Sequence, residues 1–357
     1  MSRILIQFPG HGRGRLFDPE ARDAVTEPFL HLRDRLRTLG RDLETADDRS
    51  LAGCEGILFW DFHDDLLEPS PLRRAARAAA ALLRGAPPVI PARPLYADAA
   101  RAGLLEKMVL MTAEPPVVLP RNWDGDVHAL FRTVLTWRDD LVDGGRFRKF
   151  RWPIAARFPA IPAVPFDRKN LLVNVSGNKY STHPLELYGA RRATIRHFER
   201  RLPGRFDLYG TGWEPRPGDS EPYRSYRGTV RHKWDLYPRY RFGLCYENMR
   251  EAPGFITEKI FDCLRADCVP IYWGASNITD YVDAGAFIDR RRFASDADLE
   301  EHLLGMSVAA YEEHRQAIHA YLAGPRFAAF LPPAFADTVV GALGLRPSGS
   351  QGPTDPR

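Results

Sequence analysis

The 357-residue chain is long enough for two ordinary domains, and its 44% hydrophobic and 27% charged residues are typical of a globular soluble protein. Its 50 Lys and Arg against 46 Asp and Glu leave a formal charge of +4, and no basic run forms a tail. This charge suits an anionic small ligand but falls short of the footprint of a nucleic-acid-binding protein. We therefore expect no nucleic-acid partner.

The four cysteines lie inside apolar stretches, and the spacing of Cys263 and Cys268 matches no zinc knuckle. Buried, reduced thiols in a reducing compartment are the expected state. The apolar run at residues 1–8 is too short for a signal peptide, and no stretch approaches the roughly 18 apolar residues of a membrane span. The sequence therefore predicts a cytoplasmic protein with no integral membrane segment.

Strand-like and helix-like segments alternate in the N-terminal part, which is typical of βαβ units built around a mostly parallel sheet. Residues 1–150 are therefore expected to form one α/β domain. The predicted strands lie at residues 3–8, 56–60 and 107–111, and the predicted helices at 28–39 and 72–83.

Between residues 147 and 166 the chain is dominated by Arg, Phe, Trp and Pro without a sustained period, which favours an extended linker, placed at 151–168. A second alternation then predicts another α/β domain at 169–345, followed by a disordered tail at 346–357. Its predicted strands lie at 170–175, 206–209, 242–246 and 269–273, and its helices at 185–202, 257–268 and within 296–323.

Two such domains, both Rossmann-like, would face each other across a cleft. Ligands of parallel sheets bind at the carboxyl ends of the strands. The residues that follow Tyr246 and Trp273 are therefore the first candidates for a binding site.

Within residues 241–274, a predicted strand ends in Tyr246-Glu247-Asn248 and a predicted helix begins at Thr257, with Glu258 and Lys259 in its first turn. A helix N-terminus carries free N–H groups and partial positive charge, which suit a pyrophosphate. Lys259 adds a cation there, and Glu258 can accept hydrogen bonds from ribose or sugar hydroxyls. A purely structural helix start is the alternative, since a Glu in this position stabilises any helix by up to about 1 kcal/mol. Lys259 is one of only six lysines and is mildly unfavourable there, which favours the functional interpretation.

This segment resembles the C-terminal signature of the α1,3-fucosyltransferases, glycosyltransferase family 10. The resemblance implies the two-domain GT-B architecture, inversion at the anomeric carbon, a GDP-fucose donor, and no metal or other cofactor. It also implies that Asn248, Phe255, Glu258 and Lys259 bind the donor, although many family members carry Tyr at the position of Phe255. The matching elements are Tyr246-Glu247-Asn248, Phe255, Ile256-Thr257-Glu258-Lys259 and Val269-Pro270-Ile271-Tyr272-Trp273-Gly274.

The family places an arginine at the start of the preceding helix against the donor phosphates. Arg191 matches that register best, and Arg192 lies one step away. A guanidinium suits a diphosphate because it can bond two oxygens at once. The alternative is that both arginines simply solvate a basic helix.

Family members also carry a glutamate after an N-terminal-domain strand that acts as general base on the acceptor hydroxyl. Glu114 matches it, in Thr112-Ala113-Glu114 followed by Pro115-Pro116. The N-terminal domain would then be the acceptor side. An ordinary exposed glutamate at a strand end is the alternative.

Another acidic cluster, Asp61 to Asp65, follows the strand predicted at 56–60. It could bind a cation, line the cleft for the acceptor, or form a solvated loop, and the last interpretation is favoured. No Asp-x-Asp motif ends a predicted strand, so no metal site is expected.

The function that follows is fucosyl transfer to a glycan or a glycosylated small molecule. A different nucleotide-sugar donor is the first alternative, because the Glu-Lys helix start would bind ribose and phosphates more than the sugar. A non-catalytic nucleotide-sugar-binding homologue is the second, and the presence of Glu114 argues against it.

Overall fold

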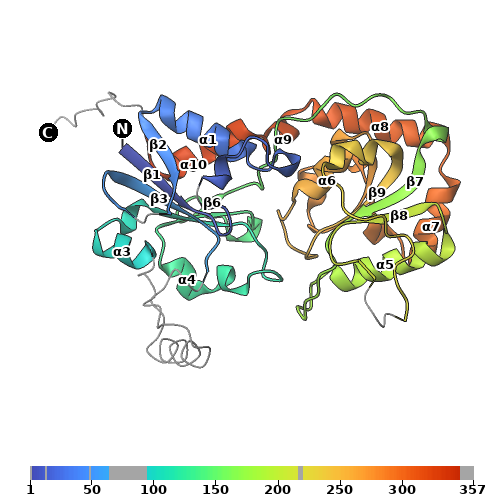
Figure 1. The fold of residues 1–357 in the computed structure, drawn as a ribbon, viewed down its shortest axis with the longest axis horizontal. Helices are drawn as coiled ribbons and strands as arrows, with labels where there is room; N and C mark the ends of the chain where they lie inside the picture. The colour runs from blue at the N-terminus through green and yellow to red at the C-terminus, as the bar shows by residue number, and fades with distance from the viewer. Residues whose placement is uncertain (1, 13, 48–49, 64–94, 216–219, 346–357) are drawn as a thin grey trace.

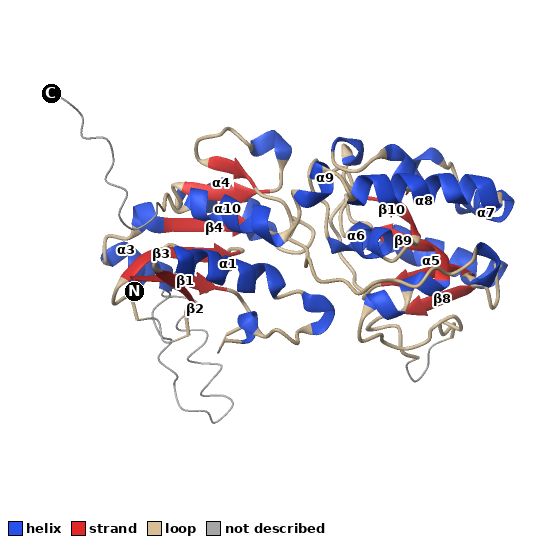
Figure 2. Ribbon diagram, turned by 90° about the horizontal axis from the view of Figure 1, so that it is seen from above, coloured by secondary structure: helices blue, strands red, loops and turns tan. Residues whose placement is uncertain are grey.

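The computed structural model describes residues 2–12, 14–47, 50–63, 95–215 and 220–345. The chain forms two α/β lobes that lie side by side, each built on its own parallel sheet (Figures 1 and 2). The two-domain architecture expected from the sequence is therefore confirmed. The helix predicted at 72–83, the tail at 346–357, and Asp64 and Asp65 lie outside the described residues.

The N-terminal sheet has the strand order β2-β1-β3-β4-β5-β6, and every pair is parallel. Helices α1 and α10 cover one face, and α3 and α4 cover the other (Figure 1). The sequence predicted β1, β3, β4 and α1 but missed the short elements β2, β5, β6, α3 and α4. The bounds are β1 Ser2–Gln7, α1 Glu27–Thr38, β2 Arg41–Thr45, β3 Cys54–Trp60, α3 Leu95–Arg101, β4 Met108–Thr112, α4 Gly125–Ala129, β5 Thr133–Thr136, β6 Phe147–Lys149 and α10 Pro332–Ala342.

The C-terminal sheet has the order β11-β10-β9-β7-β8, again parallel throughout. The strand order reverses between β7 and β9, so the carboxyl ends of these two strands border a crevice where ligands of such sheets bind. The bounds are β7 Asn170–Val175, α5 Tyr188–Arg201, β8 Phe206–Tyr209, β9 Tyr240–Tyr246, α6 Glu258–Arg265, β10 Val269–Trp273, β11 Ile288–Asp289, α7 Asp296–Gly305, α8 Val308–Leu322 and α9 Pro325–Ala328.

The last helix, α10, corrects the expected domain boundary at residue 345. After α9 the chain crosses back and α10 packs on α1 of the N-terminal lobe (Figure 1). The ring of Phe335 lies 5.4 Å from Phe29 and 6.2 Å from Phe150. The apolar face of α10 thus completes the core of the N-terminal lobe, a long-range pairing that local sequence patterns do not show.

Three of the cysteines, Cys245, Cys263 and Cys268, are buried in the C-terminal core, and Cys54 is partly buried. All four are free thiols, as expected from the sequence. Within the described ranges, none of the helices is long and apolar enough to cross a membrane.

One of the contacts that join the lobes is a polar hub around Asp139, which follows β5. Its carboxylate accepts hydrogen bonds from Lys149 of its own lobe at 2.6 Å, and from Asn277 at 2.9 Å and Tyr281 at 2.7 Å of the other. Gly254, in the loop before α6, packs against the same hub with φ +83°. A Cβ there would meet the carbonyl oxygen of Trp137 and lie 2.6 Å from Nζ of Lys149.

Gly254→Ala should therefore destabilise the contact between the lobes. A left-handed conformation costs a non-glycine residue roughly 1–2 kcal/mol, and the steric conflict adds to that cost. We expect a melting temperature lower by several degrees in differential scanning calorimetry. Gly305→Ala is the matched control, because a Cβ there meets nothing within 4 Å. Equal melting temperatures for the two variants would contradict this view of the interface.

Candidate active site

A cavity of about 420 Å³ lies between the lobes at the point where the strand order reverses. The C-terminal lobe contributes the carboxyl ends of β7 and β9, Arg191 of α5 and the start of α6. The N-terminal lobe contributes Glu114 and the segment around Asp23. Apart from Arg192, the residues expected to bind the donor thus border one space with the expected base, although they are far apart in sequence.

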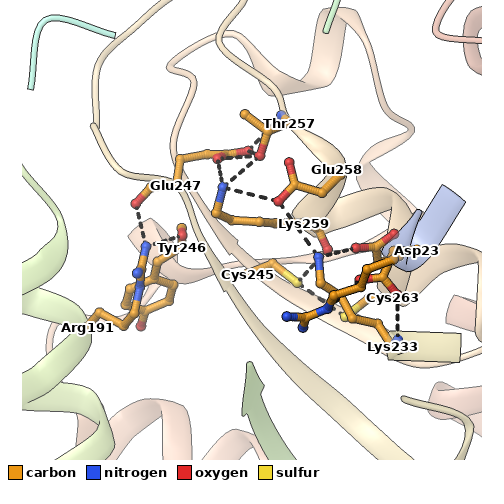
Figure 3. A network of polar contacts seen from close by, with 12 residues as sticks. Asp23, Arg191, Lys233, Cys245, Tyr246, Glu247, Thr257, Glu258, Lys259 and Cys263 are labelled. Atoms are coloured by element: carbon orange, nitrogen blue, oxygen red, sulfur yellow. Dashed lines mark hydrogen bonds and ion pairs between the residues drawn. The ribbon is translucent and has the colours of Figure 1, made fainter. Parts of the chain in front are cut away.

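The start of α6 is held by a buried carboxylate, that of Glu247, whose side chain is fully buried. It accepts hydrogen bonds from the backbone N–H of Thr257 at 2.9 Å and from its hydroxyl at 2.8 Å. Nζ of Lys259 donates to the same carboxylate at 3.1 Å and to the Thr257 hydroxyl at 2.9 Å (Figure 3). Lys259 is therefore fixed in place before any ligand binds.

Thr257 occupies the N-cap position of α6, but its hydroxyl makes no capping hydrogen bond. The hydroxyl bonds Glu247 instead, so no side chain at the cap occupies the first N–H groups of α6. The electrostatic potential of this helix end, together with Lys259, favours an anion such as a phosphate group.

Glu258 lies between two cations at the rim of the cavity. Its carboxylate is 3.8 Å from Nζ of Lys259 and 3.7 Å from Nζ of Lys233. Burial alone would raise the pKa of Glu258, but the two ammonium groups outweigh it and lower the pKa to about 2. Glu258 is therefore ionised at neutral pH and can accept hydrogen bonds from hydroxyl groups.

The structure separates the two arginine candidates. Arg191 is buried and lines the cavity, where its Nη2 donates to the carbonyl oxygens of Tyr246 at 2.6 Å and Glu247 at 2.9 Å. Arg192 does not line the cavity; its guanidinium stacks over the ring of Tyr180 at 3.9 Å. The geometry therefore supports Arg191 as a phosphate ligand and gives no support to Arg192.

Asn248 and Phe255 both line the cavity. The side-chain amide of Asn248 makes no hydrogen bond to the rest of the described chain, so it can bond a ligand. Phe255 is buried, and its ring lies 4.8 Å from that of Trp137 in the other lobe. Phe255 therefore also ties the cavity wall to the interface between the lobes.

Glu114 follows β4 and reaches the cavity from the N-terminal lobe. Its backbone N–H and that of Ala113 donate to Oδ1 of Asp61 at 2.9 and 2.7 Å. Burial, and then the nearby charge of Asp61, raise the pKa of Glu114 to about 7, against opposing effects of Lys259 and Lys179. A carboxylate poised near neutrality suits general base catalysis.

Asp61 therefore has a role that the sequence did not reveal. It is buried, adopts φ +65° and holds the turn that carries Glu114, with a further hydrogen bond from Asn122. The favoured interpretation of the Asp61–Asp65 cluster as a solvated loop is wrong for Asp61. Among the described residues, no group of three His, Cys, Asp or Glu is arranged to hold a metal ion.

Two other residues at the site were missed as functional candidates. Glu247 appeared in the sequence only as part of a motif, and its complete burial beside Lys259 could not be read there. Lys233 was visible only as one of the rare lysines; in the structure it donates to Asp262 at 2.6 Å and faces Glu258.

Two parallel-sheet lobes with a cavity at the strand reversal and a cationic helix start define the class: a glycosyltransferase fold of the GT-B type. A solved crystal structure of an α1,3-fucosyltransferase with GDP-fucose shares this fold, with a TM-score of 0.51 at 13% identity. The superposition covers 99% of this chain and 93% of that one.

Residues 174–321 match the family model of glycosyltransferase family 10 (fucosyltransferase), C-terminal part. Over 77 residues the chain is 39% identical to an alpha-(1,4)-fucosyltransferase of Arabidopsis thaliana. The aligned segment covers 21% of this chain and 19% of that protein. Over 80 residues it is 30% identical to the alpha-(1,3)-fucosyltransferase FucT of Helicobacter pylori. That segment covers 22% of this chain and 16% of the Helicobacter protein. These matches span less than a fifth of the relatives' length. The resemblance expected from the motif is confirmed over residues 174–321, which match the C-terminal domain of family 10.

Asp61→Asn tests whether Asp61 tunes Glu114. The base must be deprotonated to act, so kcat/KM of the wild type should rise with pH to a plateau above about 7, given the pKa of Glu114. Removal of the Asp61 charge should lower the pKa of Glu114 and move this acidic limb to lower pH, while the amide oxygen keeps the turn. A limb at an unchanged pH would show that Asp61 has only a structural role.

The buried pair of Glu247 and Lys259 gives a second prediction. Lys259→Met leaves a buried carboxylate without its cation, which should cost about 3 kcal/mol of unfolding free energy. Glu247→Gln combined with Lys259→Met removes both charges and should recover part of that stability in urea unfolding, but no activity. Recovery of both stability and turnover would mean that Lys259 serves only to neutralise Glu247.

Proposed function

We propose that this protein transfers fucose from GDP-fucose to a hydroxyl group of a glycan or a glycosylated small molecule, with inversion and without a metal ion. One observation carries the proposal: Lys259 at the start of α6 and Glu114 of the opposite lobe border the same cavity. In this proposal Glu114 is the base for the acceptor and Lys259 is the cation for the leaving group.

Donor binding is assigned to the C-terminal lobe. The diphosphate would lie against Lys259, Arg191 and the N-terminus of α6, with Asn248 beside it, and Glu258 would accept hydrogen bonds from the ribose hydroxyls. The choice of GDP-fucose is supported by the family match and by the similar fold of the α1,3-fucosyltransferase solved with that donor.

The reaction is a single in-line displacement. Glu114 takes the proton of the acceptor hydroxyl while its oxygen forms a bond to the anomeric carbon. The bond from that carbon to the phosphate oxygen breaks on the opposite face, and its electron pair leaves with GDP. Lys259 and Arg191 stabilise the negative charge that develops on the departing diphosphate, the role for which such preorganised cations are most effective.

A different nucleotide sugar remains the alternative donor, because Glu258 and Lys259 are placed to bind ribose and phosphate rather than the sugar. A non-catalytic binding protein is disfavoured by the position of Glu114 at the cavity that Lys259 also borders. A cytoplasmic location and the absence of a nucleic-acid partner belong to the same proposal.

Release of GDP from a panel of nucleotide sugars in the presence of EDTA tests donor and metal together. We expect slow hydrolysis of GDP-fucose and none of donors with other sugars or bases. Faster release from another donor would change the substrate, and loss of activity in EDTA with rescue by Mn²⁺ or Mg²⁺ would overturn metal independence.

Glu114→Gln keeps the shape of the side chain but cannot accept the proton. It should lower kcat for transfer by roughly 10² to 10⁴. GDP affinity should hardly change, because the nucleotide is bound by the other lobe. Normal turnover by the variant would remove Glu114 as the base.

A further inference from the structure

A second cavity, of about 300 Å³, adjoins the first. Asp23, Val25, Trp152, Lys233 and Glu258 line both spaces, so the two are direct neighbours in the gap between the lobes. Neither the donor nor the reacting hydroxyl of the acceptor has been assigned to this second cavity.

Aromatic rings from both lobes and from the segment that connects them form its walls. Trp60 of the N-terminal lobe stacks on Phe8 with ring centroids 4.9 Å apart, and meets Trp152 of the connecting segment at 6.0 Å. Trp234 of the C-terminal lobe meets Phe158 at 5.9 Å. The cavity therefore offers flat apolar surface on opposing sides.

The charged groups along its wall are bonded to the protein itself. Lys233 is paired with Asp262 at 2.6 Å. Arg265 donates to the carbonyl oxygens of Ala155 and Ala156 at 2.5 and 2.6 Å, and Arg157 to that of Pro19 at 2.9 Å. These partners use much of the bonding capacity of Lys233, Arg265 and Arg157, whereas Glu258, which lines both cavities, can still accept a hydrogen bond from a hydroxyl.

The indole N–H groups of the wall differ from these charged groups. Within the described part of the chain, those of Trp60, Trp152 and Trp234 donate to no acceptor. None of these three N–H groups is fully buried, so each is open to solvent or to a ligand. The cavity thus combines apolar faces with few free donors, which suits a ring that carries at most an ether or carbonyl oxygen.

The cavity is also close to the expected base. Trp60 is followed directly by Asp61, which holds the turn of Glu114, and Trp152 lines both cavities. An acceptor whose hydroxyl meets Glu114 can therefore extend past Trp152 between the rings.

We infer that this second cavity binds an apolar ring system carried by the acceptor beside its reacting hydroxyl, as in the aglycone of a small glycoside. The inference rests on the proposed function and narrows its acceptor from glycans in general to ring-bearing small molecules. A free oligosaccharide would leave its hydroxyls against aromatic faces and already bonded charges, which is unfavourable.

Calorimetric titration of matched 2-naphthyl and methyl glycosides of glucose, galactose and N-acetylglucosamine, with and without GDP, tests it. We expect a naphthyl glycoside to bind the wild type about tenfold or more tightly than its methyl partner, because stacking and burial of the ring favour it. Ala155→Phe, which fills the cavity, should abolish the difference, and Trp234→Ala should reduce it. Tyr180→Ala, which removes an exposed aromatic ring that lines neither cavity, should leave the difference unchanged.

Equal binding of naphthyl and methyl glycosides by the wild type, or a difference retained in Ala155→Phe, would overturn the inference. A loss of GDP affinity in Ala155→Phe would assign the cavity to the nucleobase instead and would also overturn it. Failure of the proposed function has a different signature: the wild type would not bind GDP or hydrolyse GDP-fucose, whatever the naphthyl preference.

Discussion

The site depends on the buried ion pair between Glu247 and Lys259. A carboxylate with no solvent exposure is tolerated only with a cation and hydrogen-bond donors, which Lys259 and Thr257 supply. The pair fixes the lysine at the cavity and diverts the Thr257 hydroxyl from its capping role. The Thr257 hydroxyl therefore does not cap the first N–H groups of α6, and these groups can bind an anion. Placement of a cation before the ligand arrives reduces the reorganisation that charge development would otherwise require.

The second requirement is that the lobes stay together, because the base and the cation come from opposite lobes. The Asp139 hub, the close approach of Gly254 and the contact between Trp137 and Phe255 join them beside the cavity. Asp61 performs within the N-terminal lobe the task that Glu247 performs in the other: a buried carboxylate shapes a turn and sets the electrostatics of the functional residue beside it. Each lobe thus uses a buried carboxylate to set the electrostatics of the functional residue that it contributes to the cleft.

The sequence predicted most strands and helices of the C-terminal lobe because apolar runs there are long and bounded, and the motif from Tyr246 to Gly274 placed the start of α6. It missed the two-residue strand β11 and the four-residue helix α9. It predicted Arg191 and Glu114 at the cavity only through the resemblance to family 10. It missed β2, β5 and β6, whose few residues carry too little periodicity, and α10, whose partner α1 lies some 300 residues away. Asp61 and Glu247 were also missed as functional residues, because their roles come from burial and from contacts across loops.

Calorimetry of GDP and GMP binding tests the central claim, that a preset lysine and helix start bind a diphosphate. The wild type should bind GDP at least tenfold more tightly than GMP, since only GDP brings a second phosphate to Lys259. The Glu247→Gln/Lys259→Met double variant, which removes both charges of the buried pair, should lose most of this preference and keep only the part that Arg191 and the start of α6 contribute. A preference for GDP that is undiminished in the double variant would contradict the account.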